Sequence, residues 1–146
     1  MYEPGEEGWE DDSPWLEQIK SRFADDPDVV LLSGDLSIIE LCELFSRFDL
    51  LIGARLHSAL IALRAGVPAI HIADTLKGWD IYRNLGLADW IVDIGRVLQS
   101  PEVVIDKIER ILSDPERFDR VRAAVEPVVA VNERPLLEAV RAVENR

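Results

Sequence analysis

A pattern that repeats about every twenty residues constrains the fold of this chain more than any other feature. Each repeat begins with a short apolar run and continues with a segment in which apolar residues follow helical spacing. The runs are residues 29–33, 50–54, 69–73 and 90–94. Uninterrupted apolarity is typical of strands buried on both faces, and parallel strands need crossover segments of about a dozen residues. The sequence therefore predicts an α/β fold, a parallel sheet of about four strands with helices on both faces.

Helix start and stop signals agree with this pattern. Ser37 and Glu40 form a predicted capping box, and residues 56–64 carry an apolar face that ends before Gly66. Further helices are expected over residues 14–23 and 103–112 and from residue 115 onward. We expect the prolines at 127 and 135 to divide the last segment into two or three helical pieces, which gives a helical C-terminal tail.

The length of 146 residues predicts one domain. Residues 1–12 are acidic and contain Gly and Pro, so we expect a flexible tail there and assign the single domain to residues 13–146. The net charge of −12 opposes binding to nucleic acid or to an anionic membrane surface, because both require a basic field. An anionic ligand must therefore be held by a local group of cationic side chains.

Cysteine usage and the apolar segments indicate the compartment. Cys42 is the only cysteine, which excludes an intrachain disulfide and a cysteine-based metal cluster. No basic and apolar leader is present at the start, and residues 50–73 contain two arginines and two histidines, which oppose membrane insertion. We expect a cytoplasmic protein without a metal or a cofactor.

The turn between the second apolar run and its helix carries the strongest chemical signal. Gly53 allows a ligand to approach the backbone, Arg55 offers a planar fork of donors, and the start of a helix attracts anions. His57 can bind an anion or transfer a proton near neutral pH. Since Arg55 and His57 are two residues apart, they converge only if Arg55 still belongs to the loop. The pattern indicates an anion site, although an Arg and a His that merely cap and pack are the alternative.

The same region resembles a known family. Residues 49–70 read DLLIGARLHSALIALRAGVPAI, with Arg-Leu-His after a strand, a helix of small residues and then Gly-Val-Pro. This stretch resembles the polysaccharide pyruvyl transferase family, and the resemblance extends over about residues 28–125. Asp74 and Lys77 stand where the family tends to carry Asp-Pro-Lys, although Ala73 replaces the family's usual tyrosine.

The resemblance implies a fold and a function. It implies the Rossmann-like C-terminal half of a GT-B-type protein that transfers pyruvyl from phosphoenolpyruvate to sugar hydroxyls of a bacterial cell-surface polysaccharide. Arg55 and His57 would hold the donor's carboxylate and phosphate, and His57 would transfer a proton. The full set of candidate substrate-binding residues is Gly53, Arg55, Leu56, Ser58, Asp74 and Lys77. The expected partners are phosphoenolpyruvate, a sugar acceptor, and either a second copy of the chain or an N-terminal partner domain that completes the cleft.

Two other functions remain open at this level. The chain could be a non-catalytic ligand-binding or assembly module, which the acidic charge and the half-cleft favour. It could also be the donor-binding half of a GT-B glycosyltransferase or epimerase. The side chains outside the turn favour structural interpretations: His71 is expected in the core with a hydrogen-bond partner, and Trp79, Tyr82 and Trp90 as buried aromatic area.

Overall fold

The computed structural model describes residues 13–30, 32 and 34–144, and for residues 13–15 and 132–144 it describes the backbone only. The chain divides into two compact units, residues 1–35 and 36–146. The described part of the first unit contains helix α1 (Ser13–Arg22), close to the predicted helix. The acidic tail predicted for residues 1–12 lies outside the described residues. The assignment of residues 13–146 to one domain stays a prediction.

A parallel sheet forms the centre of the second unit. Its strands are β1 (Leu51–Gly53), β2 (Ala69–Ala73) and β3 (Ile91–Asp93), in the order β1-β2-β3. The strand pairs are parallel, and Gly53 pairs with His71, which in turn pairs with Ile91. The predicted α/β class and parallel sheet are confirmed. All three carboxyl ends lie at one edge of the sheet, at Gly53, Ala73 and Asp93.

The described residues form three strands, one fewer than expected. Of the expected first strand, residues 29, 30 and 32 have no strand assignment, and residues 31 and 33 lie outside the described residues. Val30 is 76% exposed and Leu32 is 57% exposed. A strand forms only where a neighbouring backbone accepts and donates its hydrogen bonds, and apolar composition alone does not supply that neighbour.

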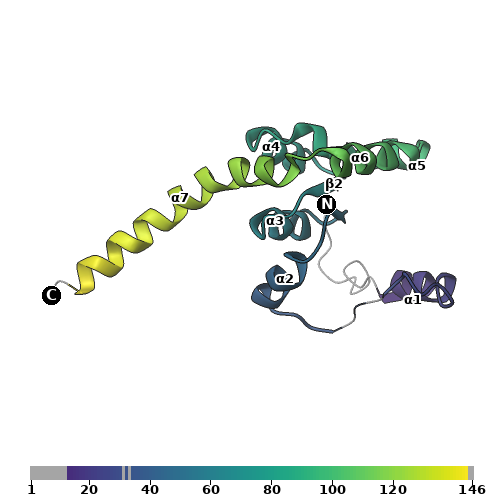
Figure 1. The fold of residues 1–146 in the computed structure, drawn as a ribbon, viewed down its shortest axis with the longest axis horizontal. Helices are drawn as coiled ribbons and strands as arrows, with labels where there is room; N and C mark the ends of the chain where they lie inside the picture. Colours follow the sequence, from purple (N-terminus) through teal and green to yellow (C-terminus); the bar gives the residue numbers. More distant parts are fainter. Residues whose placement is uncertain (1–12, 31, 33, 145–146) are drawn as a thin grey trace, which may run out of the picture. The chain divides into compact units, whose positions relative to one another are not determined.

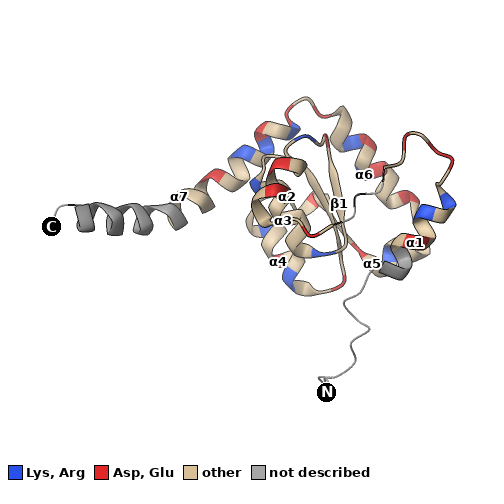
Figure 2. Cartoon of the chain, turned by 90° about the horizontal axis from the view of Figure 1, so that it is seen from below, with Lys and Arg blue, Asp and Glu red and all other residues tan. Residues whose placement is uncertain are grey.

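Helices cover both faces of the sheet, as predicted. Helices α3 (Leu56–Arg64) and α4 (Leu76–Asn84) connect successive strands and lie on one side, while α5 (Ile94–Gln99) and α6 (Glu102–Ser113) lie on the other (Figures 1 and 2). The connections from β1 to β2 and from β2 to β3 run in the same direction across the sheet. Because such connections are right-handed, both place their helices, α3 and α4, on the same face. Helix α2 (Ile38–Phe45) packs against α3.

The core lies between the sheet and these helices. Its largest fully buried side chains include Trp90, Tyr82, Leu63 and Ile70. Trp90 belongs to the short 3-10 helix η1 (Ala88–Trp90), which leads into β3. Tyr82 and Trp90 therefore supply buried aromatic area as predicted, whereas Trp79 is only half-buried. Burying an aromatic side chain of this size contributes about 2–3 kcal/mol to folding.

Local signals explain the helix boundaries. The amide of Ser37 donates to Oε2 of Glu40 at 2.8 Å, and the amide of Glu40 donates to Oγ of Ser37 at 3.3 Å, so the predicted capping box is present. Helix α3 ends before Gly66, whose φ of 84° lies in the left-handed region that glycine adopts readily. The predicted helix at residues 103–112 corresponds to α6.

The last helix corrects one prediction. Helix α7 (Arg117–Glu144) runs without a break through Pro127 and Pro135, where two or three pieces were expected. A proline removes one helical hydrogen bond, which leaves the carbonyl four residues earlier without its donor. Pro127 and Ala123 are both exposed, so water can solvate the carbonyl of Ala123. The penalty is therefore small enough for the helix to continue.

Candidate functional site

The predicted site lies at the edge of the sheet where the strands have their carboxyl ends. In parallel α/β sheets this edge is the usual place for ligands. The turn from β1 to α3 carries Gly53, Arg55, Leu56, His57 and Ser58. The turn from β2 to α4 carries the remaining candidates, Asp74 and Lys77. Because β1 and β2 are neighbours, the fold brings the two turns to adjacent positions at one edge.

Arg55 is the residue that precedes the first turn of α3. Its φ of −81° and ψ of 123° are extended, and its side chain makes no helix-capping hydrogen bond. Arg55 therefore belongs to the loop, which is the condition for its side chain to converge with that of His57. Both side chains are exposed, and His57 lies in the first turn of α3. Neither is sealed in the protein interior.

The backbone of Gly53 approaches the start of α3 closely. A Cβ atom built on Gly53 would lie 3.5 Å from the carbonyl oxygen of Arg55 and 3.7 Å from the amide nitrogen of Ala59. The amide of Ala59 donates to that same carbonyl at a long 3.4 Å. The turn is thus compact, and the first amide groups of α3 lie directly after Arg55, where a helix carries partial positive charge.

A buried histidine supports this turn from the neighbouring strand. His71 is 1% exposed, and its Nδ1 lies 3.1 Å from the carbonyl oxygen of Gly53. Its ring stacks on Tyr82, with 5.8 Å between the ring centroids. The prediction of a core histidine with a hydrogen-bond partner is confirmed. The sequence alone does not show that the partner is the backbone of Gly53, because this contact depends on the register between β1 and β2.

The remaining candidates have different surroundings. Asp74 and Lys77 are both exposed, and Leu56 and Ser58 are half-buried in the first turn of α3. Leu56 packs against the core, so its side chain anchors the turn. Among the described residues, no group of three or more His, Cys, Asp or Glu side chains is placed to hold a metal ion. The predicted residues bring an arginine, a histidine, a lysine and an aspartate to this edge, beside the first amides of α3.

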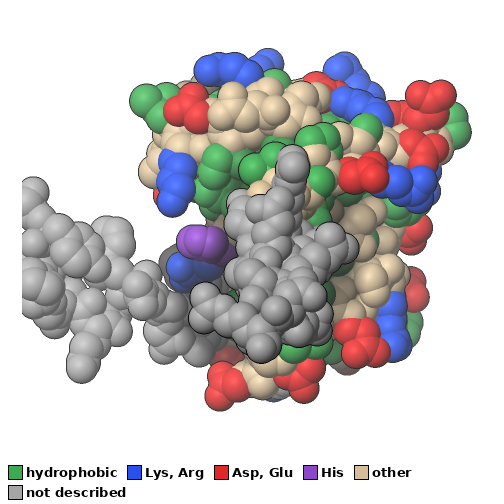
Figure 3. Space-filling model, turned by 90° about the vertical axis from the view of Figure 1, so that its left-hand side faces the viewer, with side chains coloured by type: hydrophobic (Ala, Val, Ile, Leu, Met, Phe, Trp, Pro, Cys, Tyr) green, Lys and Arg blue, Asp and Glu red, His purple; other side chains and the backbone are tan. Residues whose placement is uncertain are grey.

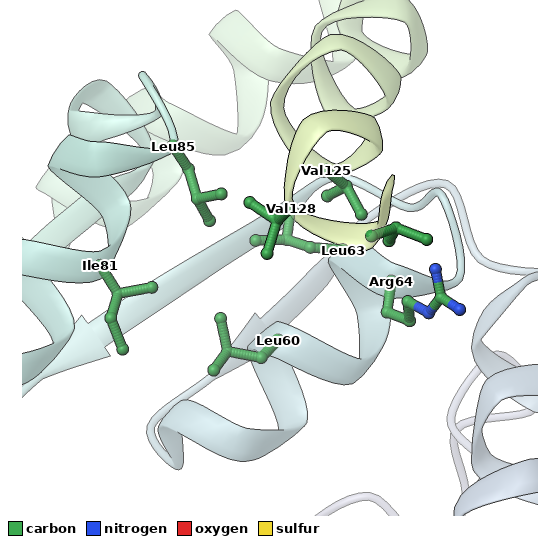
Figure 4. Close-up of a pocket in the computed structure, with 8 residues that line it drawn as sticks. Leu60, Leu63, Arg64, Ile81, Leu85, Val125 and Val128 are labelled. Carbon is green, nitrogen blue, oxygen red and sulfur yellow. The ribbon is translucent and has the colours of Figure 1, made fainter. Parts of the chain in front are cut away.

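An apolar hollow of about 400 Å³ lies elsewhere, between α3, α4 and α7. Figure 4 shows Leu60 and Leu63 of α3, Ile81 of α4 with Leu85 directly after that helix, and Val125 and Val128 of α7 around it. Arg64 is the charged residue of its lining. Since almost every lining side chain is apolar, this hollow does not fit a small anion.

Comparison with known proteins finds a family model that matches the Arg55 turn. The family model for polysaccharide pyruvyl transferases matches residues 9–74, which include all of β1, α3 and β2. The matched stretch ends at Asp74 and contains Gly53, Arg55, Leu56, His57 and Ser58. Over residues 9–74 the chain is similar to polysaccharide pyruvyl transferases. The resemblance seen in the sequence is therefore confirmed, although the model match begins earlier and ends sooner than residues 28–125.

A curated relative supports this similarity. The amylovoran biosynthesis protein AmsJ of Erwinia amylovora is 33% identical over 97 residues, which make up 66% of this chain and 23% of AmsJ. The chain thus spans about a quarter of the length of that relative. No solved structure matches the chain significantly. In the described part of the chain, no helix has the length and the apolar character needed to cross a membrane.

Proposed function

We propose that this chain is part of a cytoplasmic enzyme that transfers the pyruvyl group of phosphoenolpyruvate to sugar hydroxyls of a bacterial cell-surface polysaccharide. The observation that carries the proposal is the Arg55-Leu56-His57 turn, which lies within the family match and has the side chains of Arg55 and His57 exposed at the ligand edge of the sheet. The relative AmsJ, an amylovoran biosynthesis protein, supports a role in polysaccharide assembly.

The donor is small and multiply anionic, so its binding requires fixed cations and amide donors. The guanidinium of Arg55 can hold a carboxylate or a phosphate through two parallel hydrogen bonds. The helix amides that follow Arg55 add donors and partial positive charge, and no side chain of the N-cap residue occupies them. Lys77 adds a cation from the neighbouring turn. Gly53 keeps the backbone open to the ligand, and Ser58 and Asp74 offer polar contacts to its rim.

The reaction forms a ketal from two hydroxyls of one sugar. The oxygen of the first hydroxyl bonds to C2 of phosphoenolpyruvate, and C3 receives a proton. The bond between C2 and the phosphate oxygen then breaks, the oxygen of the second hydroxyl bonds to C2, and the proton of that hydroxyl leaves with the phosphate. We assign the proton transfer to His57, because an imidazole exchanges protons near neutral pH and this side chain is exposed beside Arg55 in sequence.

The cleft needs a second wall. The chain spans 23% of the length of AmsJ, and we propose that an N-terminal partner domain of GT-B type, or a second copy of this chain, completes the site. Large apolar side chains near the ligand edge support such docking: Leu76 is 80% exposed, Leu98 is 79% exposed and Ile52 is 45% exposed. Figure 3 shows hydrophobic side chains among charged ones on one face of the molecule.

Calorimetry with phosphoenolpyruvate tests the donor site. We expect wild type to bind phosphoenolpyruvate. The Kd of the variants Arg55→Ala and His57→Ala should rise at least about tenfold, since each variant removes a side chain that would hold the donor's anionic groups. Arg47→Ala is the matched control, because it removes an exposed arginine that pairs with Glu43 at 3.3 Å, away from the strand ends. Gly53→Ala should fold normally, because its nearest neighbours would be 3.5 Å away, and it should weaken binding.

Two results would contradict the proposal. If wild type does not bind phosphoenolpyruvate, or if all variants bind it equally, the Arg55 turn is not a donor site. Tighter binding of UDP than of phosphoenolpyruvate would instead favour a glycosyltransferase donor domain. Analytical ultracentrifugation measures self-association, and Leu76→Ser with Leu98→Ser should reduce it if copies of the chain dock through this edge.

A further inference from the structure

We propose that a hollow beside β3 binds an anionic sugar, that is, a sugar unit that carries a phosphate or a carboxylate group. The hollow has a volume of about 370 Å³ and lies between α4, β3, α5 and α6. This size is within the range of small-molecule sites, about 300–1,000 Å³. Its lining includes the charged residues Asp93, Arg96, Asp106, Lys107 and Arg110 and the aromatic residue Trp79.

One face of α6 supplies three of the five charged lining residues. Val103, Asp106, Lys107 and Arg110 are spaced so that they lie on one side of a helix, and all four line the hollow. Arg96 joins them from α5. Three cationic side chains thus gather in a chain whose net charge is −12. Such a concentration of positive charge opposes the field of the rest of the molecule.

The guanidinium groups have donors left for a ligand. Within the described residues, neither Arg96 nor Arg110 forms an ion pair, although the sequence contains 28 acidic residues. The carboxylate of Asp93 accepts from the amide of Arg96 at 3.0 Å and so caps α5. Asp106 is exposed. Lys107 donates to the carbonyl of Asp89, which leaves two of its three N–H groups.

The electrostatics of Lys107 agree with this arrangement. Burial lowers the pKa of Lys107, the carboxylate of Asp89 opposes that effect, and the positive charges of Arg110 and Arg96 lower the pKa further. The three cations therefore repel one another in the empty hollow. An anion bound among them relieves the repulsion, so the hollow favours a negatively charged ligand.

The rest of the lining fits a sugar ring. Trp79 is half-buried, and Ile91, Val92 and Val103 add apolar surface next to the charged side chains. A sugar has an apolar C–H face that packs on an aromatic ring and hydroxyl groups that hydrogen-bond to carboxylates. Inorganic phosphate would contact the cations alone and leave the apolar wall exposed. We therefore infer a ligand that has both a ring and an anionic group.

This site is separate from the Arg55 turn and does not rest on the proposed donor binding there. Strand β2 lies between β1 and β3, and neighbouring strands are about 4.8 Å apart, so the two sites are about 10 Å apart or more. None of the residues that line the hollow belongs to the β1 turn or the β2 turn.

Calorimetry with four probes tests the inference: glucose 1-phosphate, glucuronate, glucose and inorganic phosphate. We expect at least one of the two charged sugars, glucose 1-phosphate or glucuronate, to bind more tightly than both glucose and inorganic phosphate. The charged sugar that binds more tightly identifies the preferred anionic group. The double variant Arg96→Gln with Arg110→Gln should raise that Kd about tenfold or more, because it removes two charged donors. Trp79→Ala should weaken the binding of the charged sugar and leave the binding of inorganic phosphate unchanged.

Two controls separate the possible outcomes. Arg122→Gln removes an exposed arginine that pairs with Asp119 at 3.2 Å, and it should bind like wild type. Arg55→Gln should also bind the charged sugar like wild type, even if it no longer binds phosphoenolpyruvate. The inference is overturned if glucose or phosphate binds as tightly as the charged sugars, if the double variant matches Arg122→Gln, or if Trp79→Ala has no effect. Circular dichroism verifies that each variant is folded.

Discussion

The imidazole of His71 is bound to the carbonyl oxygen of Gly53, the residue that pairs with it across β1 and β2, at a distance of 3.1 Å. A carbonyl oxygen only accepts hydrogen bonds, so Nδ1 carries a proton in this contact. The bond fixes the backbone two residues before Arg55. The interior of the sheet thus determines where the exposed Arg55 turn begins.

Replacing His71 should destabilise the fold through this contact. His71→Phe keeps a ring in the core but leaves the Gly53 carbonyl without its donor, which should cost about 1–3 kcal/mol of unfolding free energy. Urea denaturation followed by circular dichroism measures the loss. His71→Gln retains an N–H donor and should lose less. A His71→Phe variant as stable as wild type would show that the hydrogen bond contributes nothing.

Gly78→Ala should also be destabilising, although alanine usually stabilises a helix relative to glycine by about 0.5–1 kcal/mol. A Cβ atom at Gly78 would lie 2.6 Å from Nε2 and 2.7 Å from Cδ2 of His71, whose ring is buried. Overpacking of this kind costs about 1–3 kcal/mol, so we expect Gly78→Ala to unfold at a lower urea concentration than wild type. Gly53→Ala is the comparison, because its nearest contact would be 3.5 Å. A gain in stability for Gly78→Ala would contradict the packing described.

Because Tyr82 is buried, we expect the protein to lose stability at alkaline pH. Its hydroxyl donates to the carbonyl of Ala69 at 3.1 Å, and burial raises the pKa of Tyr82 well above its ordinary value of 10.0. The folded state therefore keeps the phenol neutral while the unfolded chain ionises it. This contribution is complete below pH 10 and is lost as the pH rises above it.

The variant Tyr82→Phe separates the two effects. At neutral pH it should lose about 1 kcal/mol with the hydrogen bond. Above pH 10 its unfolding free energy should fall less steeply than that of wild type. Urea titrations at a series of pH values measure both. Parallel curves for the two proteins above pH 10 would contradict the assignment.

Arg120 joins α7 to the segment before β3. Its Nη2 donates to both carboxylate oxygens of Asp89, at 2.9 and 3.0 Å, and its guanidinium lies 4.8 Å from the ring centroid of Trp90. The Arg120 side chain is 36% exposed, so water screens the ion pair. We expect Arg120→Ala to cost about 1–2 kcal/mol from the ion pair and the cation–π contact together. Thermal unfolding at low and high salt checks this value, and Arg120→Lys should recover less than half because it lacks the planar fork.

Much of the fold could be predicted because its signals are local. The capping box at Ser37 and the stop at Gly66 depend on a few adjacent residues, and the structure has both. The β2 strand was predicted with its exact bounds, since continuous apolarity marks a central strand. The prediction of a strand at residues 29–33 was wrong for the described residues of that segment. A strand must pair with a backbone that is distant in sequence, and no local pattern reveals that partner.

The prediction for the last helix failed for a related reason. Whether a proline breaks a helix depends on whether the orphaned carbonyl can reach water, and that depends on which side of α7 faces the solvent. The residues of the Arg55 turn could be named from the sequence, but the buried contact that holds the turn in place could not. The cationic group beside β3 was not predicted either. The contact between His71 and Gly53 needs strand register, and the cationic group at Arg96, Lys107 and Arg110 needs the packing of α5 and α6 beside β3.

The lengths of the strands affect how copies of this protein can meet. Among the described residues, the outer strands β1 and β3 have three residues each, and only the central strand has five. An outer strand this short offers few backbone groups to a foreign strand, so growth of the sheet from one molecule into the next gains little free energy. The protein is thereby protected against edge-to-edge aggregation, even though apolar side chains remain on its surface.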